Sequence, residues 1–166
     1  MQKKTDYKWI VLALVSTAYF LAQGTRLIYS AVLPQIKEDF AASGVTDTQL
    51  GLISSTFTLI FGLVMPFAGL AADLFNRKRV LVIGSFMFAV GIFVSGFASG
   101  LGMLFISYGI INAVGQSLMP PCNTSLISQY HDETRGTAFS IYQSAIYIGS
   151  VVCSVVSGYL AQLGPG

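Results

Sequence analysis

Five polar side chains recur along one face of the first long apolar segment. They are Ser16, Tyr19, Gln23, Arg26 and Ser30, at intervals of three and four residues, which places them on one stripe of a helix. A guanidinium offers a planar fork of donors that matches a carboxylate or a phosphate. Amide, phenol and hydroxyl groups beside it would add neutral hydrogen bonds. The stripe therefore predicts a binding surface for a small anion, with Arg26 as its counter-charge.

Arg26 is the charged residue that lies deepest in this segment, about 10 Å from an end near Leu33. A charge inside the hydrocarbon is costly and normally faces water or a partner. Two plainer roles remain open at this point. The long side chain could reach the outer headgroups, or it could close a structural ion pair inside the protein.

The fourth apolar segment carries a second polar set. Tyr108, Asn112 and Gln116 lie four residues apart, and Asn123 follows the pair Pro120 and Pro121. Large amides at this depth need water or partners, so we expect Asn112 and Gln116 to line a hydrated cavity together with the first stripe. Helix packing is the alternative for both stripes, and it is the favoured role of the small-residue stripes in the second and fifth segments. Those two stripes are Gly51, Ser55, Thr58, Gly62 and Gly69, and Ser140, Gln143, Tyr147, Ser150, Ser154 and Ser157.

The elements that must position these residues are membrane-spanning helices. Of the 166 residues, 54% are hydrophobic and 10% are charged, which is too apolar for a water-soluble domain. Five stretches can cross a hydrocarbon core of about 30 Å. They cover about residues 9–33, 48–72, 80–99, 101–128 and 137–163, with a small-residue turn around residues 96–102 between the third and the fourth. The sequence predicts an all-α, multi-pass helical bundle.

Basic residues are distributed unevenly between the two sides of these spans. The N-terminal segment, the second loop and the fourth loop hold seven Lys and Arg residues, against one in the first and third loops. The positive-inside rule then places the N-terminus, the second loop and the fourth loop in the cytoplasm. We expect a multi-pass protein of the plasma or inner membrane with a cytoplasmic N-terminus.

The second loop carries a compact charged motif. It reads Gly69-Leu-Ala-Ala-Asp73-Leu-Phe-Asn-Arg77-Lys78-Arg79. Gly69 would allow another helix to approach closely, Asp73 could pair with a base or cap a helix, and the basic run holds the cytoplasmic side. A purely topogenic loop is the alternative, but it would not require Gly69 and Asp73 at this separation.

This loop resembles the signature of the major facilitator superfamily, G-x-x-x-D-(R/K)-x-G-(R/K)-(R/K). Gly69, Asp73, Arg77 and Lys78 match it, whereas Leu74 replaces a base and Asn76 replaces the second glycine. Asn also tolerates a left-handed turn conformation. The order of the spans and the segment 132–136 before the fifth span are similar to the N-terminal half of that superfamily. The run of Arg26, Ala31, Pro34 and residues 49–51 is similar to its anion-transporting branches.

The resemblance implies a fold of two six-helix bundles that works by alternating access. Helices 1 and 4 would line the cavity, and Gly69, Asp73, Arg77 and Lys78 would form a cytoplasmic gate. Residues 1–166 would be the N-terminal bundle, truncated before its sixth helix, with the lipid bilayer, a small anionic substrate and a C-terminal bundle as partners. A self-assembling half-transporter remains the alternative. Because no acidic residue lies inside the spans, proton-coupled symport would need groups outside this chain.

Other functions find little support in the sequence. His131 is the single histidine, and no Ser or Cys has a plausible base partner, so we do not expect an enzyme. Cys122 and Cys153 lie in apolar stretches without metal-ligand spacing, so neither a metal nor another cofactor is expected. No basic run with interleaved aromatics indicates nucleic acid. A structural or receptor-like helix bundle and a transporter of a neutral or cationic solute remain as rivals.

Overall fold

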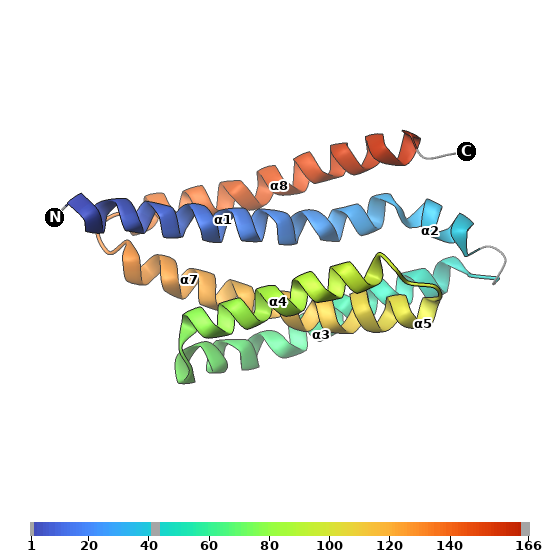
Figure 1. The fold of residues 1–166 in the computed structure, drawn as a ribbon, viewed down its shortest axis with the longest axis horizontal. Coiled ribbons are helices and arrows are strands. Elements are labelled where there is room, and N and C mark those ends of the chain that lie inside the picture. Colours follow the sequence, from blue (N-terminus) through green and yellow to red (C-terminus); the bar gives the residue numbers. More distant parts are fainter. Residues whose placement is uncertain (1, 41–43, 164–166) are drawn as a thin grey trace. The chain divides into compact units, whose positions relative to one another are not determined.

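The computed structural model describes the backbone of residues 2–40 and 44–163, and the side chains of residues 7–38, 40 and 44–159. Every regular element in these ranges is a helix (Figure 1). In chain order the helices are α1 (Gln2–Ala31), α2 (Leu33–Asp39), α3 (Asp47–Leu74), α4 (Arg77–Ser95), α5 (Leu101–Leu104), η2 (Phe105–Asn112), α6 (Ala113–Ser117), α7 (Met119–Tyr130) and α8 (Arg135–Leu163).

Five stretches of the described chain are long and apolar enough to cross a membrane. They are Tyr7–Ala31, Asp47–Leu74, Arg77–Ser95, Leu101–Tyr130 and Arg135–Tyr159. The prediction of an all-α protein with five membrane spans is therefore confirmed. The third span ends at Ser95, four residues before its predicted end, because Gly96 follows as the C-cap and the chain turns there.

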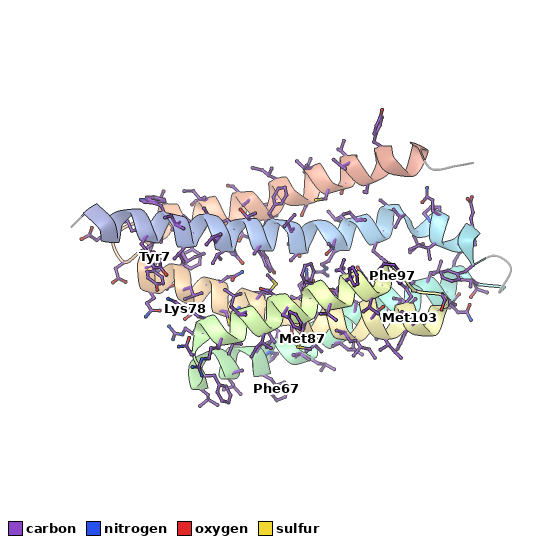
Figure 2. All side chains as sticks on the ribbon, in the orientation of Figure 1. Tyr7, Phe67, Lys78, Met87, Phe97 and Met103 are labelled. Atoms are coloured by element: carbon purple, nitrogen blue, oxygen red, sulfur yellow. The ribbon has the colours of Figure 1, made fainter. Side chains whose placement is uncertain are left out.

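Large apolar side chains cover much of the outside of these helices. Phe67 and Phe97 are each 69% exposed, and Figure 2 shows Phe67 pointing away from its helix. Exposed apolar area of this kind costs about 25 cal/mol per Å² in water and nothing comparable in lipid. At one end of the spans, Tyr7 packs edge to face on Tyr130 with ring centroids 5.7 Å apart. Amphipathic rings favour the headgroup level, so these two rings suit a membrane interface.

Contacts within the chain divide it into two compact units, which are described separately. Unit 1 contains residues 1–38 and 126–166, and unit 2 contains residues 39–125. In unit 1, α1 and α8 lie side by side and run in the same direction (Figure 1). Gly149 allows the close approach, because a Cβ there would lie 2.9 Å from the Phe20 carbonyl oxygen. Gly24 does the same for Cys153, whose Sγ would overlap a Cβ at position 24.

The face of α8 that packs against α1 is not the predicted hydroxyl stripe. The contacts come from Tyr142, Gly149 and Cys153, whereas Gln143 and Tyr147 are exposed. The reason is that the serines bond to their own helix. For example, Ser150 donates to the Ile146 carbonyl at 3.0 Å, and Ser154 donates to the Ser150 carbonyl at 2.8 Å. Satisfied hydroxyls need no partner across a helix contact. Ser157 is the stripe member that is buried.

In unit 2, the fourth span packs against both α3 and α4. Glycines again permit the crossing of α4: a Cβ at Gly84 would lie 2.9 Å from the Gly115 carbonyl oxygen, and one at Gly115 would lie 2.8 Å from the Gly84 carbonyl oxygen. The contact with α3 is aromatic, because Phe57 stacks on Tyr108 with ring centroids 5.3 Å apart. In unit 2 the fourth span therefore packs between α3, which runs parallel to it, and α4, which runs antiparallel to it.

The small-residue stripe of α3 differs from its predicted role. A Cβ added at Gly51, Gly62 or Gly69 would meet no atom of the described structure within 4 Å. An open groove follows the same face, lined by Ser54, Ser55, Thr58, Leu59, Gly62 and Leu63. Tyr108 packs instead on a neighbouring face, at Phe57. The predicted packing stripe is unoccupied by the described helices, because aromatic and β-branched side chains form the contact with the fourth span.

The fourth span is not a continuous α-helix. Residues Phe105–Asn112 form the π-helix η2, in which each turn holds one residue more than an α-helical turn. The chain then breaks at Leu118, between α6 and α7. Pro120 and Pro121 lie in the first turn of α7, where a missing N–H costs little. The irregular span carries Asn112 and Gln116.

Candidate functional site

The first-span stripe is partly packed and partly open. Tyr19 is 7% exposed and stacks on Tyr142 of α8, with ring centroids 5.6 Å apart. Ser16 is 7% exposed, and its Oγ has no hydrogen-bond partner among the described residues. The Oε1 atom of Gln23 is likewise buried without a hydrogen-bond partner in the described structure. A buried amide oxygen without a donor is unfavourable by about 1–3 kcal/mol. Gln23 is therefore suited to accept a hydrogen bond from a ligand or water.

Arg26 lies five residues before the end of α1 at Ala31, which is about 8 Å along the helix axis. Its side chain is half-buried, whereas Ser30 is exposed. Arg26 belongs to the same face as Tyr19 and Gln23, because intervals of three and four residues follow one helix stripe. The stripe thus changes from a packed end at Tyr19 to an open end at Ser30.

The two amides of the fourth span are fully enclosed. Asn112 is 1% exposed and Gln116 is 0% exposed. Neither the Oδ1 nor the Nδ2 atom of Asn112 has a hydrogen-bond partner in the described structure. Asn112 is the last residue of η2, and its main chain lies against Gly91 of α4. Unit 2 therefore holds a buried amide whose donor and acceptor are both available.

The two halves of the predicted cavity belong to different units. Tyr19, Gln23, Arg26 and Ser30 are in unit 1, and Asn112 and Gln116 are in unit 2. Their common cavity stays a prediction. Sequence reasoning did not foresee the π-helix that ends at Asn112. No residue pattern signals a π-helix, because its extra residue is set by packing against neighbouring helices.

His131 has a structural position that its sequence context did not indicate. It is 1% exposed, with Nδ1 2.9 Å from the Thr134 hydroxyl and Nε2 3.1 Å from the Lys8 carbonyl oxygen. A carbonyl only accepts, so Nε2 donates to Lys8. In the neutral ring, Nδ1 then accepts from Thr134. The Trp9 ring packs edge to face at 5.1 Å. His131 therefore joins the start of α1 to the segment before α8.

The second loop reverses the chain within two residues. Asp73 at the end of α3 and Arg77 at the start of α4 form an ion pair, with Oδ1 and Nη2 3.5 Å apart. Asn76 caps α4 by accepting from the Lys78 N–H at 3.1 Å. Its φ of −65° and ψ of 113° are those of an extended residue, so Asn76 does not use the left-handed conformation that it would tolerate. Asn76 provides a side-chain acceptor for this cap, which a glycine at the same position would lack.

The basic run of this loop works against helix stability. Arg77, Lys78 and Arg79 occupy the first turn of α4, which contains no acidic residue. Positive charge is unfavourable at a helix N-terminus, where the dipole is itself positive. Asp73 offsets part of this repulsion through its pair with Arg77. Gly69 is half-buried one turn earlier on α3, and Lys78 is exposed. These charges therefore do not stabilise the start of α4.

The family model of the Major Facilitator Superfamily matches residues 15–165, nearly the whole chain. The chain belongs to the major facilitator superfamily. Its sequence identity to the individual proteins described here is 30% or less. It is 30% identical over 165 residues to Multidrug resistance protein 1 of Bacillus subtilis, covering 98% of this chain and 40% of that protein.

Other members of the superfamily differ in what their names say they transport. Riboflavin transporter RibZ of Clostridioides difficile is 26% identical over 156 residues, covering 93% of this chain and 33% of RibZ. Monocarboxylate transporter 9 of Gallus gallus is 23% identical over 155 residues, covering 93% of this chain and 30% of that protein. The chain therefore spans between 30% and 40% of the length of these three relatives.

Proposed function

We propose that the protein containing this chain is a secondary active transporter that moves a small organic or inorganic anion by alternating access. One observation carries the substrate class: Arg26 is half-buried in an apolar span, on the face that also presents the unpartnered Gln23 oxygen. Charged residues inside a span normally face the bundle interior or a water-filled path, where an anionic substrate can reach them. A carboxylate or phosphate would provide bidentate hydrogen bonds to its planar fork.

Each predicted polar residue then has a distinct part. Arg26 binds the anionic group, and Gln23, Tyr19 and Ser30 hold the substrate along the first stripe. Asn112 and Gln116 complete the cavity from the fourth span with neutral amides. The buried Asn112 amide, whose two polar atoms lack hydrogen-bond partners, supports this part of the proposal. Gly69, Asp73, Arg77 and Lys78 form the cytoplasmic gate.

The proposal extends to the rest of the protein. A C-terminal bundle would complete the two-bundle fold that alternating access requires. The seven basic residues on one side support a cytoplasmic N-terminus in the cell membrane. A cysteine at Asn76 should react with an impermeant thiol reagent only in inverted vesicles. Labelling in intact cells would show that this loop and the N-terminus lie outside the cell.

A second candidate is a transporter of a neutral or cationic solute. Two of the relatives described above are named for riboflavin and for multidrug resistance, which favours this candidate. In that case Arg26 would reach the headgroups and the aromatic and amide groups would hold the solute. The two candidates differ in whether the charge of Arg26 is needed for transport.

The decisive experiment measures uptake of radiolabelled monocarboxylates, hexuronates and phosphate by cells expressing the complete open reading frame. Arg26→Ala is compared with Arg26→Lys, which keeps the charge but loses the fork. Lys37→Ala is the matched control, because it removes one positive charge at the end of α2. Loss of a charge-assisted hydrogen bond predicts about a 10- to 100-fold higher KM in Arg26→Ala.

The outcomes separate the candidates. A raised KM in Arg26→Ala, an intermediate value in Arg26→Lys and an unchanged value in Lys37→Ala support the anion. Equal uptake of an anion by wild type and Arg26→Ala, at equal abundance in the membrane, would show that Arg26 is not the counter-charge of the substrate. Transport of a neutral or cationic solute by both proteins would then support the second candidate. Uptake by residues 1–166 alone would indicate a self-assembling half-transporter.

A further inference from the structure

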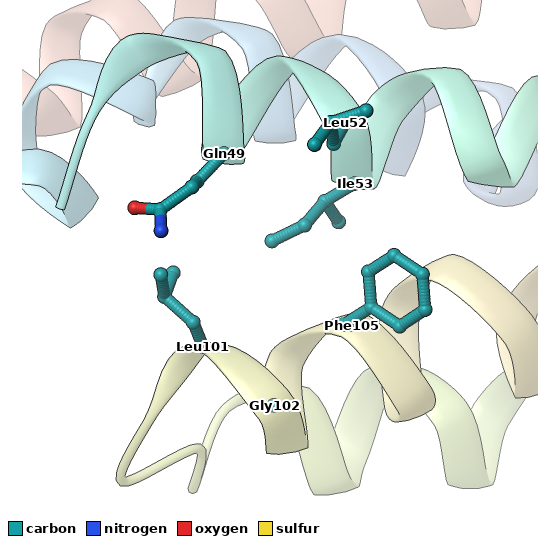
Figure 3. A pocket seen from close by; sticks show the side chains of 6 residues that line it. All are labelled: Gln49, Leu52, Ile53, Leu101, Gly102 and Phe105. Atoms are coloured by element: carbon teal, nitrogen blue, oxygen red, sulfur yellow. The ribbon is translucent and has the colours of Figure 1, made fainter.

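A small pocket lies within unit 2, at the end where α3 and the fourth span both begin. Its volume is about 260 Å³. Its lining consists of Gln49, Leu52 and Ile53 of α3 and Leu101, Gly102 and Phe105 of the fourth span (Figure 3). None of these residues belongs to the two polar stripes or to the charged loop. The pocket is therefore distinct from the proposed transport site.

Gly102 lines the pocket and contributes no side chain to it. A Cβ at Gly102 would meet no atom within 4 Å, so the space beside it is open. Ile53 forms the floor and is 2% exposed, whereas Leu52 is 56% exposed at the rim. The walls are mostly apolar, and the pocket is open on one side.

Gln49 supplies a hydrogen-bond donor at one end of these apolar walls. Its Oε1 accepts from the Thr46 N–H at 3.0 Å, and the Gln49 N–H bonds in turn to the Thr46 hydroxyl. This capping box holds the side chain in place and identifies which amide atom is oxygen. Figure 3 shows the amide nitrogen directed toward Leu101, inside the pocket. A ligand with a hydrogen-bond acceptor at its head would suit this donor.

The volume of the pocket and its depth along the span indicate what kind of molecule could occupy it. Pockets for drug-sized solutes hold about 300–1,000 Å³, so 260 Å³ suits a chain segment better than a whole solute. Gln49 lies two residues into α3 and Ile53 six, which is about 3 Å and 9 Å from the start of the span. Those depths correspond to the boundary between headgroups and hydrocarbon. Phospholipid ester carbonyls and the first methylene groups lie at this level.

We propose that this pocket binds the upper part of one phospholipid acyl chain, with the Gln49 amide donating a hydrogen bond to its ester carbonyl. The occupant comes from the bilayer that surrounds the five spans. The pocket joins the start of α3 to the start of the fourth span, so the lipid would fill the gap between two helix ends. This binding does not depend on the transported substrate.

The test uses the complete transporter in phosphatidylcholine vesicles that contain a phospholipid with a diazirine near the ester end of one acyl chain. After irradiation, mass spectrometry maps the labelled residues. We expect labelling at residues 49–53 and 101–105 above that at Phe93 and Phe97, which are each 69% exposed and lie at the same end of the spans. A second lipid with its diazirine at the chain terminus should not label the pocket.

Two variants address the site itself. Gly102→Leu should fill the pocket and abolish its labelling, whereas Gly100→Leu is the matched control, since a Cβ at Gly100 also meets open space and its φ of −167° suits any residue. Gln49→Glu keeps the acceptor for Thr46 but removes the donor, so we expect about fivefold weaker labelling. Unchanged labelling in Gly102→Leu, or labelling no stronger than at Phe93 and Phe97, would overturn the proposal.

Discussion

Gly91 of α4 lies directly against the main chain of Asn112 in the fourth span. A Cβ at position 91 would be 2.8 Å from the Asn112 nitrogen and 3.0 Å from its Cα. The contact falls at the last residue of the π-helix, where the buried Asn112 amide has no hydrogen-bond partner among the described residues. The position of a proposed substrate contact is thus set by a glycine on a neighbouring helix.

Gly91→Ala should destabilise the protein. The added methyl group must displace backbone, which costs about 1–3 kcal/mol in a packed core and exceeds the helix-propensity gain of about 1 kcal/mol. Thermal unfolding in detergent measures the change. Gly62→Ala is the control, because a Cβ there meets no atom within 4 Å, and we expect it to be neutral or slightly stabilising. A Gly91→Ala protein as stable as Gly62→Ala would contradict the close contact.

Deleting one residue from the π-helix should abolish transport while leaving the protein folded. A π-helical turn holds one residue more than an α-helical turn, so deletion of Ile110 permits a continuous α-helix in which the residues after Asn112 keep their places. The register of Gly115 against Gly84 is then kept, but Asn112 is moved. Unfolding temperature and uptake are measured together.

Deletion of Val114 is the matched control for the π-helix. It lies outside η2, so it rotates every later residue by about 100° and removes Gly115 from its contact. We expect loss of folding in this case. Full uptake by the Ile110 deletion would show that the π-helix has no role in transport.

His131→Ala should loosen unit 1 at the start of α1. The ring loses its bonds to Thr134 and to the Lys8 carbonyl and its packing on Trp9, and we expect about 1–3 kcal/mol of destabilisation. His131→Phe keeps a ring beside Trp9 but removes both bonds. Limited proteolysis of residues 131–134, with thermal unfolding, separates the two contributions. If His131→Phe matches wild type, the hydrogen bonds contribute nothing.

Asp73→Asn should reduce transport with little effect on stability. The Asp73 side chain is 73% exposed, and its pair with Arg77 spans 3.5 Å, so the pair is worth less than about 1 kcal/mol. Loss of uptake at unchanged thermal stability would therefore report a gate. Asp132→Asn, an exposed acid in the fourth loop, is the control. Normal uptake by Asp73→Asn would remove this residue from the gate.

Local chemistry made most of the fold predictable. A run of about 20 apolar residues must become a helix in lipid, because every backbone N–H and C=O needs a partner there. Five spans, the all-α class and the family motif between Gly69 and Lys78 followed from the sequence alone. The basic loop was recognised in the same way, although the cap formed by Asn76 was not, because a cap and a left-handed turn accept the same residue.

Contacts between helices were decided only by the tertiary structure. The hydroxyl stripe of α8 predicted a packing face, yet the serines bond their own carbonyls and Gly149 receives Phe20 instead. The π-helix ending at Asn112 and the pocket beside Gly102 likewise have no sequence signature. The physical reason is that apolarity and length act on each helix separately, through lipid. Which face packs, and where a helix widens, depends on the shape of the neighbouring helix.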